Sequence, residues 1–112
     1  MSDYVAVLIT AGSQAEADQI ARTLVQESLA ACVNVIPGLT SFYRWEGEVQ
    51  QDEEWLLMAK SRHDTLDALT VRVQAIHSYD VPEVIALPLA GGSEAYLSWI
   101  DQEVQISTPD HG

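Results

Sequence analysis

Hydrophobic positions in the first stretch of the chain do not alternate with polar ones. Residues 4–10 are apolar at odd and even positions alike, apart from the closing Thr10, and most of the side chains are β-branched or otherwise apolar. Because successive side chains of a strand point to opposite faces of a sheet, this pattern predicts a strand buried on both faces. We therefore place it at the centre of a sheet. Its two faces carry Val5, Val7 and Ile9, and Tyr4, Ala6 and Leu8.

The stretch from Cys32 to Arg62 is predicted to form one long β-hairpin that turns at Glu46-Gly47. Each arm has about a dozen residues and would reach roughly 40 Å at the rise of a strand. Pro37-Gly38 interrupts the first arm and indicates a bend or bulge within it. We expect the start of the first arm to pair with the strand at residues 4–10. Arms of this length extend beyond a small domain. An isolated two-stranded hairpin is only marginally stable in water unless it packs against another surface.

Helical spacing of apolar residues follows in three further places. Ser13 and Glu16 form a capping box that opens a helix over about residues 13–29. Asp64 is expected to cap a second helix, whose apolar stripe ends near His77-Ser78. Ser93 is expected to cap a third. The members of the two apolar stripes are Leu66, Leu69, Val73 and Ile76, and then Tyr96, Ile100 and Val104.

A short apolar strand at residues 84–87 completes the order β-α-β, β-α-β, α. This order predicts an α+β fold, a ferredoxin-like split βαβ sandwich with an antiparallel sheet, a long hairpin between the second and third strands, and an extra C-terminal helix. Residues 1–106 are expected to form a single domain and residues 107–112 a flexible tail. Both main helices would cover one face of the sheet, so the apolar second face predicts self-association.

Charge narrows the possible partners. Seventeen Asp and Glu residues against five Lys and Arg residues give a net charge of −12, which excludes nucleic acid and anionic membranes as natural partners and favours cations. One cysteine cannot form an internal disulfide, and the chain begins with no signal-peptide pattern and has no apolar run long enough to span a bilayer. We therefore expect a cytoplasmic protein. No catalytic triad, CxxC, HExxH or phosphate-binding loop motif is present, which predicts a binding protein and not an enzyme.

Three residues are candidate metal ligands. Cys32 is the only thiol in the chain, and its simplest role is a small buried hydrophobe. As a thiolate it would suit Cu(I) or another soft ion. His77 could instead interact with the carbonyl end of the second helix, or join Glu83 in binding a borderline divalent ion. Copper or another divalent cation is thus the candidate cofactor.

A second set of residues suggests an interface or a cleft between subunits. Trp45 and Trp55 are expected to flank the hairpin tip and to pack between subunits. Glu54 is expected to pair with Lys60 or an arginine, and Lys60, the only lysine, is expected in a salt bridge or a ligand cleft. Tyr79 and Asp80 follow His77 and are placed in the same cleft.

Several segments together resemble the CutA family, the divalent-cation-tolerance proteins, over about residues 5–106. The resemblance implies a compact homotrimer of ferredoxin-like subunits, similar in architecture to the PII signalling proteins, with a role in the response to divalent metal ions and in copper binding. A PII-like sensor that binds a small ligand between subunits is the alternative. The segments that carry the resemblance are Leu29–Asn34, Ile36–Gly38, Tyr43–Gly47, Glu53-Glu54, Lys60, His77–Glu83, Leu87-Pro88 and Tyr96–Trp99.

The chain departs from the family pattern at positions that matter for copper. The usual His-Pro-Tyr is His77-Ser78-Tyr79 here. Copper binding in the family is associated with a thiol on the first strand and with paired histidines before the Pro-Tyr segment, and Ile9 and Ile76 occupy those places. We therefore expect weak, largely electrostatic uptake of metal ions in this member. The protein partner, if the chain has one, is not indicated.

Overall fold

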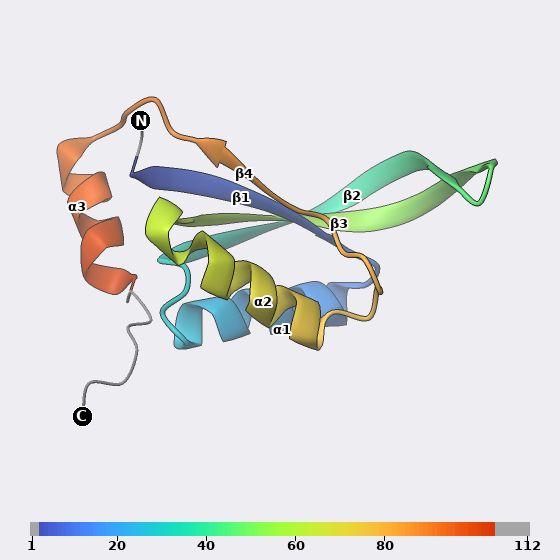
Figure 1. Ribbon diagram of the computed structural model, residues 1–112, viewed down its shortest axis with the longest axis horizontal. Helices are drawn as coiled ribbons and strands as arrows, with labels where there is room; N and C mark the ends of the chain where they lie inside the picture. Colours follow the sequence, from blue (N-terminus) through green and yellow to red (C-terminus); the bar gives the residue numbers. More distant parts are fainter. Residues whose placement is uncertain (1–2, 105–112) are drawn as a thin grey trace.

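The computed structural model describes residues 3–104 and contains one four-stranded sheet with two helices on one face (Figure 1). The strand order is β2-β3-β1-β4 and every neighbouring pair is antiparallel. The expected ferredoxin-like architecture is confirmed, and the predicted tail at residues 107–112 lies outside the described residues. The elements are β1 (Tyr4–Ala11), α1 (Gln14–Gln26), β2 (Cys32–Trp45), β3 (Glu48–Arg62), α2 (Leu66–Ile76), β4 (Val84–Pro88) and α3 (Glu94–Glu103).

One pairing prediction is wrong. The start of β2 does not pair with β1; β3 lies between them and pairs with β1 from Tyr4↔Arg62 to Ala11↔Trp55. The second arm carries four apolar residues in a row, Leu56 to Ala59, and so is apolar on both faces, whereas Asn34 and Pro37-Gly38 interrupt the apolar start of the first arm, so the second arm gains more from an interior place. β2 is left at the edge of the sheet.

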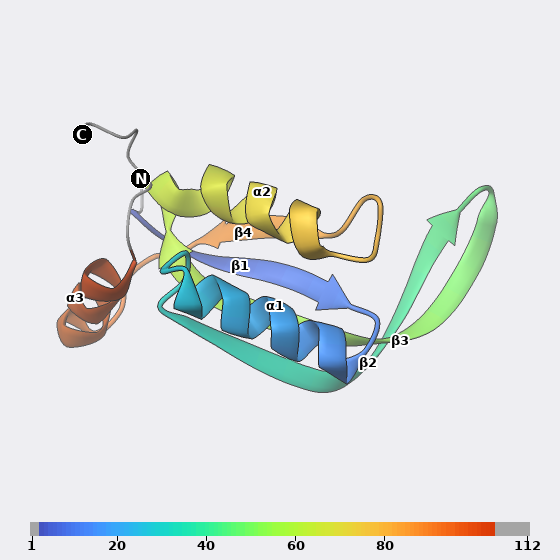
Figure 2. The same cartoon turned by 90° about the horizontal axis from the view of Figure 1, so that it is seen from below.

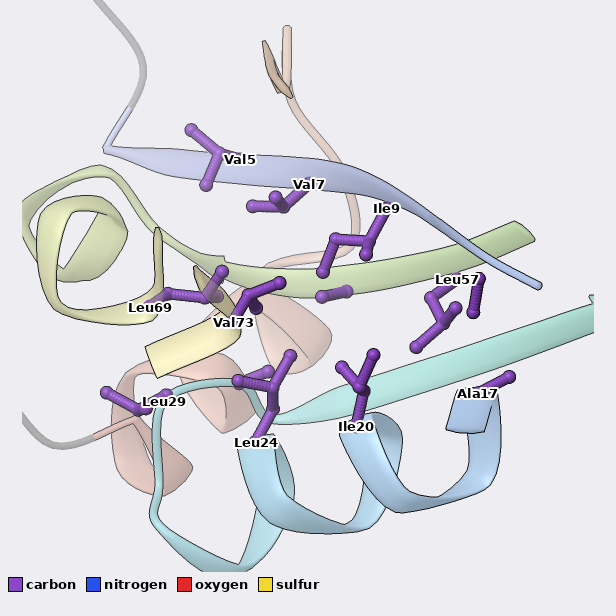
Figure 3. Packing of buried hydrophobic residues seen from close by; sticks show 13 residues of the cluster. Val5, Val7, Ile9, Ala17, Ile20, Leu24, Leu29, Leu57, Leu69 and Val73 are labelled. Atoms are coloured by element: carbon purple, nitrogen blue, oxygen red, sulfur yellow. The ribbon is translucent and has the colours of Figure 1, made fainter. Parts of the chain in front are cut away.

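The core lies between the sheet and the two helices (Figure 3). Val5, Val7 and Ile9 of β1 face Ile20 and Leu24 of α1 across this layer, and the side chains are wholly or almost wholly buried. Leu69 and Val73 of α2 are also fully buried, as their helical spacing predicts. Within residues 3–104, no helix is long and apolar enough to cross a membrane.

Helix starts agree with the predicted caps in two of three cases. The Ser13 and Ser93 side chains accept hydrogen bonds from the backbone N–H groups of Glu16 and Tyr96. Asp64 does not cap α2; it lies in a short 3₁₀ turn before the helix and forms an ion pair with Arg62. The carboxylate is drawn to the guanidinium because a bidentate pair with Arg is stronger than one hydrogen bond to an exposed N–H.

The C-terminal helix packs on the open face of the sheet through a small separate cluster. Ala31, Ile100 and Val104 are its buried members, and Tyr4 and Leu97 pack against them. The prediction included Tyr96 in this stripe, but Tyr96 is exposed and its ring lies against that of Trp99. Leu97 is the next residue along the helix and takes the inward position instead.

The long hairpin projects beyond the sheet, as the sequence predicts (Figure 2). Pairing between β3 and β1 ends at Trp55, so residues 39–54 of the two arms pair only with each other. We call residues 39–54 the distal hairpin. Its base is marked by a bulge, where the register jumps across Pro37 and Gly38, and Gly38 has φ +85°. Its tip is a two-residue turn in which Glu46 and Gly47 both have positive φ, the geometry that suits the right-handed twist of the arms.

The open face of the sheet is apolar in the isolated chain. Ile85 and Leu87 of β4 are half exposed, and Ile36 of β2 is 39% exposed. The distal hairpin adds Phe42, Trp45 and Val49, which are all more than half exposed. No other residue of the described part of the chain covers these apolar side chains.

Candidate functional site

A cleft of about 550 Å³ opens where the distal hairpin leaves the sheet, between the hairpin and the segment that follows α2. Its volume is in the range of small-molecule sites. The hairpin supplies aromatic and polar side chains to one wall, and residues 79–83 supply the opposite wall. The lining residues are Thr10, Ser41, Phe42, Tyr43, Trp45, Glu54, Tyr79, Asp80, Val81 and Glu83.

Glu54 is the most deeply buried charged residue of this cleft, with 7% of its surface exposed. The Tyr79 hydroxyl donates to Glu54 Oε2 at 2.8 Å. Burial, and then the hydrogen bond to the Glu54 carboxylate, raises the pKa of Tyr79 well above its ordinary value, so the phenol stays protonated and keeps donating. Tyr79 can lie this close because position 12 is glycine: a Cβ there would meet the Tyr79 hydroxyl at 3.0 Å.

Within one chain Glu54 does not pair with Lys60, the first of the two partners expected from the sequence. The two residues lie on one strand six positions apart, roughly 20 Å along it. Lys60 donates to the side chain of Asn34 on the neighbouring strand. Glu54 instead finds the phenol of Tyr79, a neutral donor that leaves the negative charge of the carboxylate unbalanced.

His77 lies beneath the cleft with its side chain fully buried. Its Nδ1 accepts a hydrogen bond from the Tyr79 backbone N–H at 3.0 Å. Its Nε2 is 2.7 Å from the Thr10 carbonyl oxygen and must therefore carry the proton and donate. Both ring nitrogens are thus engaged, which joins the end of β1 to the loop after α2. His77 does not interact with the carbonyl end of α2 through its ring.

Glu16 anchors the same loop from α1. Its two carboxylate oxygens accept from the backbone N–H of Ser78 at 2.7 Å and from the Ser78 hydroxyl at 3.0 Å. The capping-box prediction therefore holds only for the Ser13 half, because the Glu16 carboxylate is turned toward Ser78. Burial alone would raise the pKa of Glu16, but the hydrogen bonds from Ser78 and the nearby His77 ring outweigh it, and the pKa is lowered.

Glu16→Gln should lower the free energy of unfolding by about 1–3 kcal/mol near neutral pH, because an amide has one acceptor oxygen and its NH₂ group cannot accept the second hydrogen bond. A lowered carboxyl pKa gives stability that is present above the unfolded-state pKa and is lost as the pH falls through the folded-state pKa. The deficit of the variant should therefore shrink toward zero in acid. Urea unfolding at one protein concentration, at neutral pH and again at about pH 3, measures this.

Glu53→Gln is the matched control for that comparison, since Glu53 is an exposed acidic residue of β3. Its unfolding free energy should differ little from that of the parent at either pH. An equal, pH-independent deficit in both variants would show that the carboxylate of Glu16 has no special role in holding the loop.

The three candidate metal ligands do not meet in one place. Cys32 begins β2 at the level of Lys60, which pairs with Ala6 of β1, whereas His77 contacts Thr10 at the other end of that strand. Glu83 lies on the cleft wall, where burial and the charge of Glu54 raise its pKa. Within residues 3–104 no group of three or more His, Cys, Asp or Glu side chains is arranged to hold a metal ion.

The remaining predicted site residues divide into two groups. Trp45 and Asp80 line the cleft together with Glu54, Tyr79 and Glu83. Trp55 does not: it packs against the core, and its ring N–H donates to Gln14 Oε1 at 2.9 Å.

Sequence reasoning missed the roles of Thr10, Glu16 and Ser78. Each acts through a partner more than 60 positions away along the chain, as in the bond from Ser78 to Glu16 and that from His77 to Thr10. Phe42 and Tyr43, for which the sequence gives no place in a ligand site, also line the cleft. The alternation of the strand could have indicated that Ser41, Tyr43 and Trp45 share one face of the hairpin.

Comparison with known proteins gives a consistent result across sequence and structure. A family model described as CutA1 divalent ion tolerance protein matches residues 5–103. The divalent-cation tolerance protein CutA of Thermus thermophilus is 53% identical over 94 residues, which covers 84% of this chain and 91% of that protein. The chloroplastic protein CutA of Arabidopsis thaliana is 51% identical over 96 residues, which covers 86% of this chain but only 53% of the relative's length.

Solved structures match equally well. The structure of the divalent cation tolerance protein Cut A1 from Thermus thermophilus has a TM-score of 0.90 at 49% identity, covering 91% of this chain and 99% of that one. The structure of CutA1 from Oryza sativa has a TM-score of 0.92 at 46% identity, covering 95% and 97%. The architecture described above is therefore that of a known structural family.

Proposed function

Because the chain belongs to the CutA1 divalent ion tolerance family, we propose that it is a non-enzymatic homotrimer that acts in the response to divalent cations and holds them loosely through its negative field. The proposal that the chain holds divalent cations rests on its net charge of −12, with only five basic residues in the sequence. A trimer would multiply this charge threefold on one particle, and such a field concentrates divalent counterions near the surface.

The trimer is supported by what the isolated subunit leaves uncovered. The distal hairpin exposes Phe42, Trp45 and Val49, and β4 exposes Ile85 and Leu87 on the open face of the sheet. A soluble protein rarely presents this much apolar surface without a partner, and copies of the same chain are the most economical partner. The edge strand β2 would also be protected from uncontrolled pairing by such an assembly.

Loose association is favoured over a dedicated copper centre by the chemistry of the three candidate ligands. Cys32 and His77 lie at different ends of the sheet, and both nitrogens of the His77 imidazole already form hydrogen bonds. A soft ion such as Cu(I) needs thiolate or imidazole ligands that converge. Carboxylates dominate the charge of the chain instead, and these favour hard or borderline divalent ions.

Divalent ions should therefore be displaced by salt. Equilibrium dialysis with Mn²⁺ or Ca²⁺ should show several ions per chain in dilute buffer and a several-fold drop near 1 M NaCl, where the Debye length falls to about 3 Å. Cys32→Ser and His77→Ala should leave this uptake unchanged, although His77→Ala is expected to lower stability. One ion per chain retained in high salt, and lost in both variants, would contradict loose association and establish a Cys–His metal site.

A second candidate function is favoured by the cleft at the base of the distal hairpin. A protein that senses a small ligand needs a concave site with a few converging polar groups, and this cleft has the required volume and lining. In a trimer the distal hairpin would reach toward a neighbouring copy, so occupation of the cleft could be communicated between subunits. The ligand would then regulate the response to cations and would not be a substrate.

The cytoplasm is the proposed location, because a single cysteine cannot form an internal disulfide and suits a reducing compartment. Relatives are named for other compartments: the Arabidopsis thaliana protein is chloroplastic and the CutA of Archaeoglobus fulgidus is described as periplasmic. Cell fractionation followed by immunoblotting would test this location directly.

A further inference from the structure

The walls of the cleft combine carboxylates with aromatic rings and contain no positive charge. Of the ten described residues that line it, Glu54, Asp80 and Glu83 are acidic, and none is Lys, Arg or His. The aromatic rings that form much of the remaining surface carry partial negative charge on their faces and attract cations, most strongly where water is excluded. Anionic ligands such as nucleotides are disfavoured by the same walls. The four aromatic side chains are those of Phe42, Tyr43, Trp45 and Tyr79.

Glu54 brings to the cleft a carboxylate oxygen that has no hydrogen-bond partner among the described residues. Glu54 is more than nine-tenths buried, and only its Oε2 accepts a hydrogen bond, from Tyr79. Oε1 receives none from the part of the chain that the structure describes, and Glu54 is one of the residues that line the cleft. A largely buried carboxylate beside a cleft is stabilised by an N–H donor that carries a positive charge.

A cation in the cleft would also stabilise a second carboxylate. Glu83 also lines the cleft, and its pKa is raised by burial and by the charge of Glu54. A positive group placed between the two acids would relieve their repulsion. The aromatic rings beside them would hold an apolar chain or the spread-out charge of an organic cation better than they would a small hydrated ion.

A bare metal ion fits this cleft poorly. No group of three or more acidic, histidine or cysteine side chains within residues 3–104 converges closely enough to hold a metal ion, and a cavity of about 550 Å³ is far larger than one ion needs. A quaternary ammonium would gain from the rings but has no N–H for Glu54 Oε1. The class of cationic ligand that remains is an alkylammonium with N–H donors.

We propose that the cleft between the distal hairpin and residues 79–83 binds an organic ammonium cation of the size of a short diamine, with one ammonium group on Glu54 and the alkyl chain against the rings of Tyr43 and Tyr79, the two rings of the wall that the proposed trimer contact does not use. The inference rests on the second candidate function, that of a cleft that senses a ligand, and names the class of that ligand. The proposal that divalent ions associate loosely with the surface is independent of it.

Calorimetric titration of the assembled protein with 1,4-diaminobutane, at about 0.15 M NaCl to screen the general field, tests the inference. The expected result is saturable binding of one diamine per chain. The neutral diol of the same length, 1,4-butanediol, should give no saturable signal. Glu54→Gln should weaken diamine binding roughly tenfold or more, because it removes the charged acceptor but keeps the shape of the side chain.

Glu53→Gln is the matched control, with the same change of charge one position away. Glu53 is exposed and points to the opposite face of β3, so diamine affinity should be unchanged. Equal weakening in both variants would show that the diamine responds only to the general field, and would overturn the proposed site. The comparison of diamine with diol is made on the parent protein, so it stands even if Glu54→Gln fails to fold.

Two further outcomes separate this inference from the function on which it rests. If diamine and diol both bind with similar affinity, the cleft is a ligand site without selectivity for cations, and the inference is wrong while the second candidate function stands. If neither binds, the inference is wrong and no diamine site exists in the cleft. The salt dependence of Mn²⁺ or Ca²⁺ uptake is measured separately and is not affected by either result.

Discussion

Trp45→Ala should dissociate the assembled protein into single chains that keep their fold. Trp45 pairs with Glu48 beside the hairpin turn and is 55% exposed in the isolated subunit, so its own subunit gains little from it. Truncation of a large aromatic side chain that is buried between subunits costs roughly 3–5 kcal/mol at each contact. Sedimentation equilibrium at micromolar concentration would report the loss of assembly, and far-UV circular dichroism would report the retained fold.

Val71→Ala provides the control for this experiment. Val71 is 64% exposed on α2, far from the hairpin, so its removal should leave the mass of the assembly unchanged. The concentration dependence of the melting temperature should separate the same variants, because a subunit stabilised by assembly melts at a temperature that rises with protein concentration. The parent and Val71→Ala should show that dependence and Trp45→Ala should not. Assembly unchanged in Trp45→Ala would mean that the hairpin tip is not an interface.

Trp55→Ala is expected to act on the fold of the subunit instead. The Trp55 ring packs against the core, and its N–H donates to Gln14 at the start of α1. It also sits opposite the Pro37-Gly38 bulge, at the last position of β3 that pairs with β1. Removing the ring should lower the free energy of unfolding by roughly 3–5 kcal/mol. Denaturant unfolding of the parent and the variant at equal chain concentration measures the difference.

Trp55→Phe separates the ring from its hydrogen bond. Phenylalanine keeps most of the apolar contact and loses the donor to Gln14, so the expected loss is about 1 kcal/mol. A small loss of stability in Trp55→Ala combined with loss of assembly would contradict this assignment. It would place Trp55 at the interface, where the sequence alone puts it together with Trp45.

The difference between Trp45 and Trp55 shows what local sequence can and cannot indicate. The hairpin itself was predictable, because Glu46-Gly47 suits a two-residue turn and Pro37-Gly38 marks an irregularity in the first arm. Which of the two tryptophans meets the core depends on where β1 ends beside β3. That is a property of the assembled sheet and has no local signal.

The cleft was predictable only in part, for the same reason. Tyr79, Asp80 and Glu54 are candidates from the sequence because ionisable and aromatic residues cluster in their segments, and the structure brings them together in the cleft. The residues that hold these side chains in place were not predicted. Glu16 has an adequate local role in the capping box, and nothing near it in the sequence indicates that its carboxylate turns instead to Ser78.

Native mass spectrometry of protein purified from its own cells tests most directly the proposal that this chain forms a homotrimer that holds cations loosely. We expect a species of three chains that carries divalent ions when sprayed from dilute buffer and none after a high-salt wash. A species of one chain, or a trimer that keeps one metal ion per chain through the wash, would contradict it.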